Sequence, residues 1–451
     1  MRVHFIAIGG SAMHNLALAL NAKGYRVSGS DDEIFDPSRS RLLKAGLLPP
    51  QNGWFPEKIS ADLDAVILGM HARKDNPELL RAKEKGVKIF SYPEFLYEQS
   101  KDKKRLVIAG SHGKTTITAM VLHVLRKNGI SCDYMVGAQL EGFDVMVKMS
   151  RESSIMVFEG DEYLTSAIDP RPKFHLYKPH IALITGIAWD HINVFPSFEN
   201  YIGQFKSFIE LIEAGGALVW YKGDPELGKI AESNREISSI AYDLPQYHRR
   251  EGRVFLRGGG KEYPVKVFGT HNLQNIAGAF EVCRLLGVTD QGFLEAISTF
   301  GGASRRLQLI AENSHSAVYL DFAHAPSKLK ATTAAMKEHF SKRQLCACME
   351  LHTYSSLNRE FLSQYRGAMD AADEALVFYS PHALSLKRLP PIYPEDIRDA
   401  FGRDDLRVFS DREEMQAYLL SLEWNKRNLL LMSSGSFEGL DVSGLAEKIL
   451  K

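Results

Sequence analysis

Short apolar runs alternate with amphipathic stretches along most of the chain. In the first hundred residues, apolar runs at 3–8, 25–28 and 65–68 predict strands, and the stretch 12–23 predicts a helix. Further strands are predicted at 106–108, 155–158, 181–185, 317–320, 375–379 and 429–432, and further helices at 272–286 and 327–340. Strands that alternate with helices are typical of parallel sheets covered by helices, so the pattern predicts an α/β protein.

A glycine-rich turn follows the predicted strand at 106–108 and opens an amphipathic helix. The turn and the start of the helix comprise Gly110, Ser111, His112, Gly113, Lys114, Thr115 and Thr116. In such a turn, backbone N–H groups point at phosphate oxygens, the lysine supplies positive charge and the threonine hydroxyl can ligate Mg²⁺. A complete P-loop has a second glycine at the position of Ile108. The strand before and the helix after still provide the required context, so we expect a nucleotide triphosphate here.

A second glycine turn lies at the end of the first predicted strand. Gly9 and Gly10 there let phosphates approach backbone amides, and Asp31 follows the second strand. Asp31 either accepts a hydrogen bond from a sugar hydroxyl or is an ordinary turn residue. The G-x-G-x-x-G fingerprint is absent, because Ser11 follows the glycine pair, so we predict a diphosphate nucleotide other than a dinucleotide.

The length of the chain sets the number of domains. At 451 residues the chain is too long for one ordinary core, and about 150 residues per domain suggests three. A charged segment near 101–105 and the pair Gly301-Gly302 are natural boundaries. We predict three consecutive α/β domains: a Rossmann-like N-terminal domain (1–102), a P-loop ATPase-like central domain (103–300) and a Rossmann-like C-terminal domain (301–451).

Composition restricts the partners and the compartment. Lysine plus arginine equals aspartate plus glutamate at 55 each, so no global field attracts nucleic acid or anionic membranes. The four cysteines lack disulfide or metal-ligand spacing, no apolar run reaches about 18 residues, and the N-terminus begins with a strand. We expect a cytoplasmic protein that acts on small molecules; its oligomeric state is not predictable from these features.

Two acidic segments follow predicted strands of the central domain. Glu159-Gly160-Asp161-Glu162 comes after the strand at 155–158, and Asp190-His191 comes after the strand at 181–185. Because α/β sheets place ligands at the carboxyl ends of their strands, these side chains are expected near the phosphate turn. Carboxylate oxygens suit Mg²⁺, so we predict that these segments help hold the metal.

Three later segments carry further candidate residues. Asn272 and Asn275 share a helix face and can read an adenine edge by donating and accepting together. Ser304-Arg305-Arg306 offers guanidinium groups at the second boundary, and their fork suits phosphate. Asp321-Phe322-Ala323-His324 ends another strand and is a candidate nucleotide contact.

In this order, the motifs resemble those of the Mur ligases, ATP-dependent amide-forming enzymes of peptidoglycan metabolism, over essentially the whole chain. The resemblance implies that the first domain holds a UDP-sugar through Gly9, Gly10, Ser11, Asp31 and His71. It implies that Lys114 contacts the β- and γ-phosphates of ATP, and that Thr115, Glu159 and His191 position Mg²⁺. Asn272 and Asn275 would meet adenine or the γ-phosphate region, Arg306 would contact phosphate, and Asp321 would contact the ATP ribose.

Within the family, the first-domain turn and the loop 69–78 resemble members that use UDP-N-acetylmuramate as acceptor. Its lactyl carboxylate would attack the γ-phosphate to give an acyl phosphate, from which an amine displaces phosphate. The segment 161–179, with Asp161-Glu162-Tyr163 where other members have a D-E-S-D-like stretch, resembles members that attach the recycled tripeptide L-alanyl-γ-D-glutamyl-meso-diaminopimelate. L-alanine is the alternative amine. The loop 432–436 is expected to help form the amine pocket.

Two positions depart from the family pattern. The usual histidine pair after the third-domain aspartate is replaced by His324-Ala325-Pro326, which leaves the role of His324 open. Lys206 has the spacing from His191 of a carbamylated lysine ligand in some Mur ligases, but its place in an amphipathic helix also suits a surface lysine.

Three other classes of protein fit the sequence less well. A dinucleotide-dependent oxidoreductase would need a complete G-x-G-x-x-G and no ATP turn, and both conditions fail. A P-loop binding module without ligase chemistry would leave Glu159, His191 and Arg306 unexplained. Folate-polyglutamating relatives share the central ATP motifs, but they do not normally begin with a UDP-binding domain.

Overall fold

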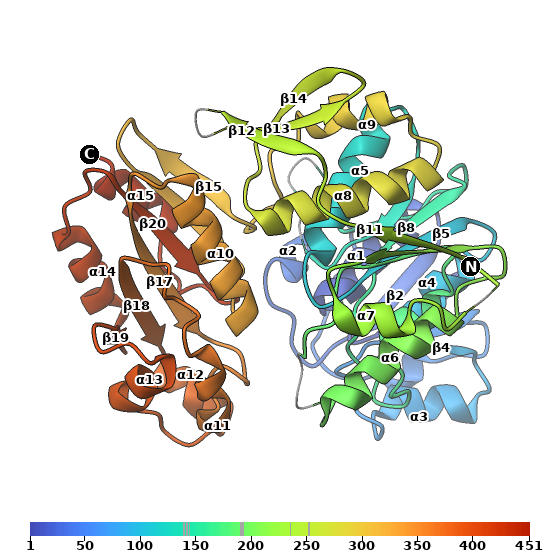
Figure 1. Ribbon diagram of the computed structural model, residues 1–451. Coiled ribbons are helices and arrows are strands. Elements are labelled where there is room, and N and C mark those ends of the chain that lie inside the picture. Colours follow the sequence, from blue (N-terminus) through green and yellow to red (C-terminus); the bar gives the residue numbers. More distant parts are fainter. Residues whose placement is uncertain (139, 141–142, 144, 190–193, 235, 251–252) are drawn as a thin grey trace. The chain divides into compact units, whose positions relative to one another are not determined.

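The computed structural model describes residues 1–138, 140, 143, 145–189, 194–234, 236–250 and 253–451. Spatial contacts divide the chain into two compact units (Figure 1). Unit 1 comprises 1–189, 194–243 and 277–293, and unit 2 comprises 244–276 and 294–451. The predicted α/β class is confirmed, since each third of the chain forms a largely parallel sheet with helices.

The N-terminal part of unit 1 is a four-stranded parallel sheet of order β2-β1-β3-β4. Its strands are β1 (Arg2–Ile6), β2 (Arg26–Ser30), β3 (Ala65–Leu68) and β4 (Ile89–Ser91). Its helices are α1 (Ser11–Ala22), α2 (Ser38–Lys44), η1 (Pro56–Lys58), α3 (Pro77–Glu84) and α4 (Tyr92–Glu98). All four residues of β3 are buried, as expected of a central strand covered on both faces.

The rest of unit 1 is built on a seven-stranded sheet of order β11-β10-β9-β5-β8-β6-β7, in which only β7 runs antiparallel. Its strands are β5 (Lys104–Ala109), β6 (Asp133–Met135), β7 (Val147–Lys148), β8 (Ile155–Glu159), β9 (Ile181–Ile184), β10 (Ala217–Tyr221) and β11 (Ser238–Tyr242). Its helices include α5 (Lys114–Lys127), η2 (Lys173–Tyr177), α6 (Phe198–Glu210) and α7 (Pro225–Ile230). β5 lies at the centre, so the turn that follows it emerges in the middle of the sheet's carboxyl edge.

Unit 2 contains a small antiparallel sheet and a larger mixed one. The small sheet comprises β12 (Tyr247–Arg250), β13 (Arg253–Gly258) and β14 (Lys261–Val265). The larger has the order β15-β16-β20-β17-β18-β19, with strands β15 (Gln308–Glu312), β16 (Ala317–Asp321), β17 (Gln344–Leu351), β18 (Glu374–Tyr379), β19 (Arg407–Phe409) and β20 (Arg427–Met432). Only β15 is antiparallel in the larger sheet. The carboxyl ends of β16, β20 and β17 therefore lie side by side.

Helices cover both faces of the six-stranded sheet. Figure 1 shows α10 (Pro326–His339) on one side, and α14 (Arg412–Ser421) and α15 (Val442–Ile449) on the other. Buried side chains of α14 and α15 join those of β16, β17, β18 and β20 in one core. The remaining helices are α8 (Thr270–Leu285), α9 (Asp290–Ile297), α11 (Arg359–Leu362), η3 (Ser363–Tyr365), α12 (Pro381–Leu386) and α13 (Pro394–Phe401). α8 and α9 each continue from one unit into the other along the sequence.

One hydrophobic core joins the first two sheets of unit 1. It includes Val3 and Phe5 of β1, Phe95 of α4, Val107 of β5 and Phe158 of β8, all nearly inaccessible to solvent. A second cluster covers the other face of the N-terminal sheet and includes Ile6, Val66 and Leu79. The two sheets are therefore packed as one body, and the domain bounds drawn from the sequence stay a prediction.

The ends of the predicted elements differ from those in the structure by at most two residues. The first strand ends at Ile6 instead of residue 8, because Ala7 takes a left-handed conformation (φ 69°) and both Ala7 and Ile8 donate backbone hydrogen bonds to the carbonyl of Ser30. This turn directs Gly9 and Gly10 toward the start of α1.

Candidate active site

The phosphate turn is built as a tight connection between β5 and α5. Gly110 has φ 115°, and a Cβ placed on it would lie 2.2 Å from the Thr185 hydroxyl oxygen, so only glycine fits. Gly113 is left-handed (φ 74°) and directly precedes α5. Gly113 is the N-cap residue and has no side chain that could cap the helix itself, and a helix N-terminus attracts anions. The geometry fits a phosphate at this end of α5.

Lys114, the first residue of α5, is held by a backbone carbonyl and a carboxylate. Its ammonium donates to the Gly110 carbonyl and to Glu162 Oε2, each at 2.7 Å, and Glu162 is only 2% exposed. Burial lowers the pKa of Lys114, but the carboxylates of Glu162, Asp161 and Glu159 outweigh this effect and raise it above its ordinary value. Lys114 is therefore a permanently charged group at the phosphate turn.

Thr115 and Glu159 form the oxygen pair expected of a magnesium site. The Thr115 hydroxyl donates to Glu159 Oε1 at 2.6 Å, and the other carboxylate oxygen accepts from the Gly137 N–H at 2.8 Å. A hydroxyl and a carboxylate beside a phosphate turn are donors that suit Mg²⁺. Asp190 and His191 lie outside the described residues, and within the described part no three His, Cys, Asp or Glu side chains gather as a metal site.

Lys206 lies on the exposed face of α6, while Phe205, Phe208 and Ile209 point into the core. Because Lys206 is exposed to solvent, the structure agrees with the interpretation that it is an ordinary surface lysine. A role as a carbamylated metal ligand stays a prediction without structural support.

A buried hydroxyl network supports the phosphate turn and was missed from the sequence. The Tyr201 hydroxyl lies 3.0 Å from Ser111 Oγ and donates to Glu162 Oε1 at 3.3 Å. Ser111 Oγ also accepts from the Ala188 N–H at 2.8 Å. Tyr201 fits the apolar face of α6, so the sequence pattern identifies it only as a core residue.

The N-terminal glycine turn is organised by Asp31. Asp31 Oδ2 accepts from the Gly9 N–H at 2.7 Å, and Oδ1 accepts from the Asp32 N–H at 3.0 Å. Burial raises the pKa of Asp31 to about 6. Gly10 precedes α1, whose first residue, Ser11, is exposed. Asp31 thus holds the turn, as one of the two sequence interpretations expected; a contact with a sugar hydroxyl stays a prediction, as does the role of the exposed His71.

In unit 2, the two candidate asparagines lie buried on one face of α8. The Asn272 amide donates to the Phe268 carbonyl at 2.9 Å, and the Asn275 amide donates to Asn272 Oδ1 at 3.4 Å. Their remaining hydrogen-bonding capacity is compatible with a base edge, and their predicted role is not tested by these contacts.

Asp321 is the last residue of β16, and Arg305 and Arg306 lie just before β15, the neighbouring strand. Asp321 accepts from the Leu307 N–H at 3.1 Å and from the Thr332 hydroxyl at 2.7 Å, so both carboxylate oxygens have partners within unit 2. The guanidinium groups of Arg305 and Arg306 lie 5.7 and 4.7 Å from the centre of the Phe322 ring. Asp321 therefore shapes the 305–307 segment; its predicted contact with ribose, and that of Arg306 with phosphate, stay predictions.

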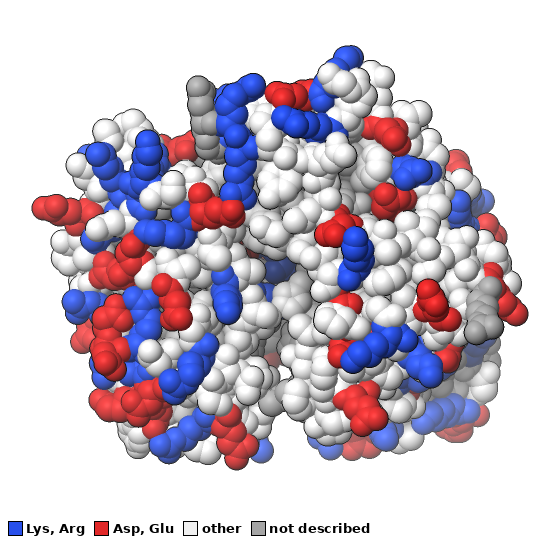
Figure 2. Space-filling model, in the orientation of Figure 1, with Lys and Arg blue, Asp and Glu red and all other residues white. Residues whose placement is uncertain are grey.

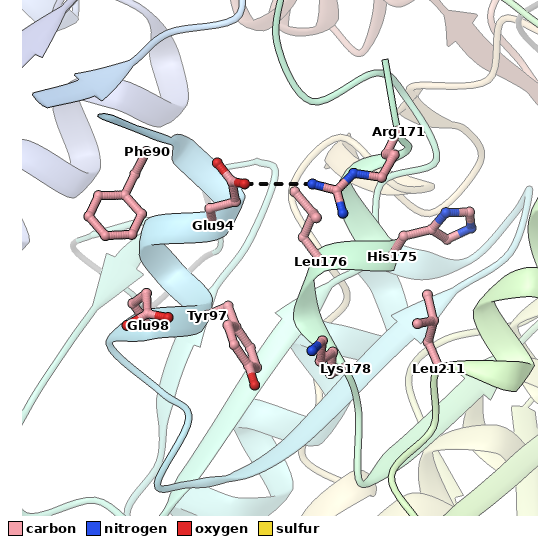
Figure 3. A pocket seen from close by; sticks show the side chains of 9 residues that line it. All are labelled: Phe90, Glu94, Tyr97, Glu98, Arg171, His175, Leu176, Lys178 and Leu211. Atoms are coloured by element: carbon pink, nitrogen blue, oxygen red, sulfur yellow. Dashed lines mark ion pairs between the residues drawn. The ribbon is translucent and has the colours of Figure 1, made fainter. Parts of the chain in front are cut away.

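A separate cavity of about 350 Å³ lies in unit 1 between α4 and the segment 171–178 (Figure 3). Glu94 and Glu98 line it from α4, and Arg171 and Lys178 line it from the other segment. Glu94 and Arg171 form an ion pair of 3.6 Å across it. Since none of the predicted nucleotide-binding residues lines this cavity, it is distinct from the phosphate turn.

The surface charges agree with the equal numbers of basic and acidic residues in the sequence. Basic and acidic side chains are intermixed on the face shown in Figure 2. Within the part of the chain that the structure describes, every helix is too short or too polar to cross a membrane.

Family models match nearly the whole chain in three parts. The Mur ligase family catalytic domain matches residues 2–104, the Mur ligase middle domain matches 108–283, and the Mur ligase glutamate ligase domain matches 305–435. A UDP-N-acetylmuramate–L-alanine ligase of Arthrobacter sp. (strain FB24) is 33% identical over 387 residues, which cover 83% of this chain and 80% of the relative. The chain belongs to the Mur ligase family. Mur ligases are ATP-dependent enzymes that form C–N bonds in peptidoglycan synthesis, and this chain is such a ligase.

Solved Mur ligase structures share the three-domain architecture. A UDP-N-acetylmuramate–alanine ligase from Thermotoga maritima superimposes with a TM-score of 0.72 at 21% identity, covering 100% of this chain and 98% of that chain. A UDP-N-acetylmuramate:L-alanyl-γ-D-glutamyl-meso-diaminopimelate ligase from Neisseria meningitides has a TM-score of 0.60 at 25% identity, covering 66% of this chain and 98% of that chain. The prediction of three consecutive α/β domains is thereby confirmed.

Proposed function

We propose that this Mur ligase joins the lactyl carboxylate of UDP-N-acetylmuramate to an amine, with hydrolysis of ATP to ADP and phosphate. The observation that supports this proposal most is the glycine turn at the start of α5, where the Lys114 ammonium and the Thr115–Glu159 pair lie together. A cation, a hydroxyl and a carboxylate at a helix N-terminus form a site for a metal-bound triphosphate.

The reaction needs two steps. The substrate carboxylate attacks the γ-phosphorus, the bond to the β-phosphate oxygen breaks, and ADP leaves. The amine then attacks the carbonyl carbon of the acyl phosphate, the C–O bond to phosphate breaks, and the nitrogen loses a proton. Mg²⁺ would offset charge on the phosphates, and Lys114 would stabilise the charge that develops during transfer. Glu162, paired with Lys114 here, would orient the ammonium before phosphate arrives.

Binding roles follow the family pattern residue by residue. We assign the UDP-sugar to the turn of Gly9, Gly10 and Ser11 with Asp31 and His71. We assign ATP to the phosphate turn together with Asn272, Asn275, Arg306 and Asp321. We assign Mg²⁺ to Thr115, Glu159 and His191.

The similarity to the L-alanine ligase of Arthrobacter sp. (strain FB24) favours L-alanine as the amine, because the match covers 83% of this chain and 80% of that ligase. A second candidate is the tripeptide L-alanyl-γ-D-glutamyl-meso-diaminopimelate. The segment 161–179 favours it, since Asp161-Glu162-Tyr163 resembles members that attach that peptide, and one solved tripeptide ligase is 25% identical to this chain. In the structure, Glu162 of this segment pairs with Lys114 at 2.7 Å, so the start of the segment contacts the phosphate turn.

Phosphate release tests both parts of the proposal. The purified protein is given MgATP and UDP-N-acetylmuramate with either L-alanine or the tripeptide, and kcat/KM is measured for each amine. We expect release to require UDP-N-acetylmuramate and to be faster with L-alanine. Faster release with the tripeptide would establish the second candidate, and release that does not depend on UDP-N-acetylmuramate would contradict the acceptor assignment.

A further inference from the structure

A buried carboxylate lies at the carboxyl edge of the six-stranded sheet. Glu350, near the end of β17, is 2% exposed. Its Oε2 accepts from the Phe437 N–H at 2.8 Å and from the Ser433 hydroxyl. Both donors belong to residues 433–437, here called the 433–437 loop, which follows β20. A buried carboxylate that accepts two hydrogen bonds from one loop fixes the shape of that loop.

Other contacts fix the same loop from neighbouring strands. The Ser433 N–H donates to the Asp321 carbonyl at 2.9 Å, and the Gly435 N–H donates to the Ser433 hydroxyl oxygen at 2.6 Å. The Gly435 carbonyl accepts from Arg305 Nη2. A Cβ on Gly435 would lie 2.8 Å from Glu350 Oε2, so the loop approaches the carboxylate as closely as glycine allows.

The backbone is strained on both sides of this contact. Arg305 and Leu307 have φ of 53° and 47°, and Phe437 and Glu438 have φ of 48° and 52°. Left-handed conformations are unfavourable for residues with side chains and gather at ligand-binding sites. Two strained segments, joined by the Arg305–Gly435 hydrogen bond, therefore lie at the edge where α/β sheets bind ligands.

Two buried polar atoms of this region stand out for their hydrogen bonding. Arg305 Nε and Ser434 Oγ are buried and have no hydrogen-bond partner among the described residues. Buried polar atoms are almost always paired in native proteins, so these two point to a bound group that supplies an acceptor. A guanidinium N–H and a hydroxyl can both donate to a carboxylate.

We propose that Glu350 is a positioning residue for the amine substrate: it holds the 433–437 loop so that Ser434 and Arg305 donate to that substrate's carboxylate. The inference rests on the proposed function, because L-alanine and the tripeptide both carry a carboxylate besides the reacting amine. Glu350 itself contacts only the protein. Its charge, and not only its volume, keeps Ser433 and Phe437 in place.

Steady-state kinetics of Glu350→Gln test the proposal. The amide keeps the size of the side chain but removes the charge from the hydrogen bonds, so the KM of the amine should rise about tenfold. The KM values of MgATP and UDP-N-acetylmuramate, and kcat at saturating amine, should change less than about twofold. A purely structural role would instead lower kcat or the amount of folded protein. Glu413→Gln, at an 86% exposed site in the same unit, is the matched control.

Ser434→Ala provides a second variant that removes one unpartnered atom without disturbing the loop. The wild-type protein should prefer the amine substrate over its carboxamide, for example L-alanine over L-alaninamide, and this preference should shrink several-fold in the variant. Unchanged amine KM in Glu350→Gln together with an unchanged preference in Ser434→Ala would overturn the inference.

Direct binding separates this inference from the proposed function. Calorimetry measures binding of L-alanine and of the tripeptide to the full chain with UDP-N-acetylmuramate and a non-hydrolysable ATP analogue. Weaker amine binding in both variants supports the inference even if the wild-type protein shows no turnover, in which case only the proposed function fails. Equal amine binding by the wild-type protein and both variants overturns the inference.

Discussion

At the scale of single residues, the nucleotide site depends on charges that are paired before any ligand arrives. Lys114 is only 17% exposed and Glu162 is 2% exposed, so their ion pair is largely shielded from water. Removing one partner of a buried ion pair strongly destabilises the folded protein, because the other charge stays buried without compensation. Changes at Lys114 must therefore be judged for both folding and catalysis.

Lys114→Ala should lower turnover by at least about 10²–10³-fold, because the charge that stabilises phosphoryl transfer is lost. Affinity for UDP-N-acetylmuramate should stay largely intact, since that substrate is assigned to the Gly9–Gly10 turn. Phosphate release and calorimetry measure the two effects, and circular dichroism checks the fold. Lys127→Ala, an exposed position on the same helix, should behave as wild type. Retained turnover in Lys114→Ala would remove Lys114 from its assigned role.

Asp31 should make stability depend on pH. Its pKa is raised from 3.8 to about 6, so the folded chain keeps this proton to a higher pH than the unfolded chain does. The contribution of Asp31 to the free energy of unfolding is therefore largest at low pH and is lost as the pH rises through about 6. Relative to Asp31→Asn, the wild-type protein should therefore lose about 1 kcal/mol of unfolding free energy between pH 5 and pH 7.

Urea unfolding of both proteins at the two pH values measures this difference. Asp75→Asn, at a 70% exposed carboxylate, is the control and should show no such change. A constant difference between wild type and Asp31→Asn across this range would show that Asp31 titrates normally.

At the scale of elements, the β5–α5 turn depends on the absence of a side chain at Gly110. A Cβ there would meet the Thr185 hydroxyl oxygen at 2.2 Å in a backbone conformation that disfavours L-residues. Gly110→Ala should lower the unfolding free energy by more than about 2 kcal/mol and abolish ATP binding. Gly203→Ala in α6 is the matched control, because its Cβ meets nothing within 4 Å; it should be neutral or stabilise the helix by about 0.5–1 kcal/mol. Equal unfolding midpoints in urea for both variants would contradict the packing argument.

The elements were predictable where the signal is local. β3 coincides with the predicted strand 65–68, and the predicted helix 327–340 differs from α10 by one residue at each end, because periodicity and flanking turns act over a few positions. The small sheet of β12 to β14 was not predicted. Its strands are short and carry many charged residues, such as Arg249, Arg250 and Lys261, although β13 does alternate between buried and exposed positions.

The site was predictable only in part. The residues of the phosphate turn are contiguous, so the motif identified them directly. The acidic segment with Glu162 was also expected there, because it follows a strand of the same sheet. Other partners come from far along the chain and were not expected: Tyr201 lies 90 residues from Ser111 of the phosphate turn, and Glu350 lies 83 residues from Ser433 of the 433–437 loop. Such pairs depend on how strands are ordered in the sheet, and a single sequence contains no signal for that order.

At the scale of the whole molecule, the N-terminal sheet is fastened to the central one. Besides the shared core, Asn15 of α1 accepts from the Met146 N–H at 3.3 Å. The junction near residue 103, where the sequence predicts a domain boundary, is also tightly bonded. Unit 1 is thus expected to present the proposed UDP-sugar and phosphate turns from one rigid body.

Arg105→Ala tests how this junction is held. The Arg105 side chain is 2% exposed and donates to the carbonyls of Ser100, Lys101, Lys103, Tyr177 and Lys178 and to the carboxylate of Glu213. Its removal takes a donor from each of those acceptors, of which the Ser100 carbonyl still accepts from the Lys103 N–H, so the unfolding free energy should fall by about 3–5 kcal/mol. Trypsin should then cut faster after Lys101, Lys103 and Lys104, which mass spectrometry of the fragments would show. Arg284→Ala, at a 52% exposed site in the same unit, should change neither quantity. If Arg105→Ala unfolds at the wild-type urea concentration and is cut no faster, the two sheets are held together by their shared core alone.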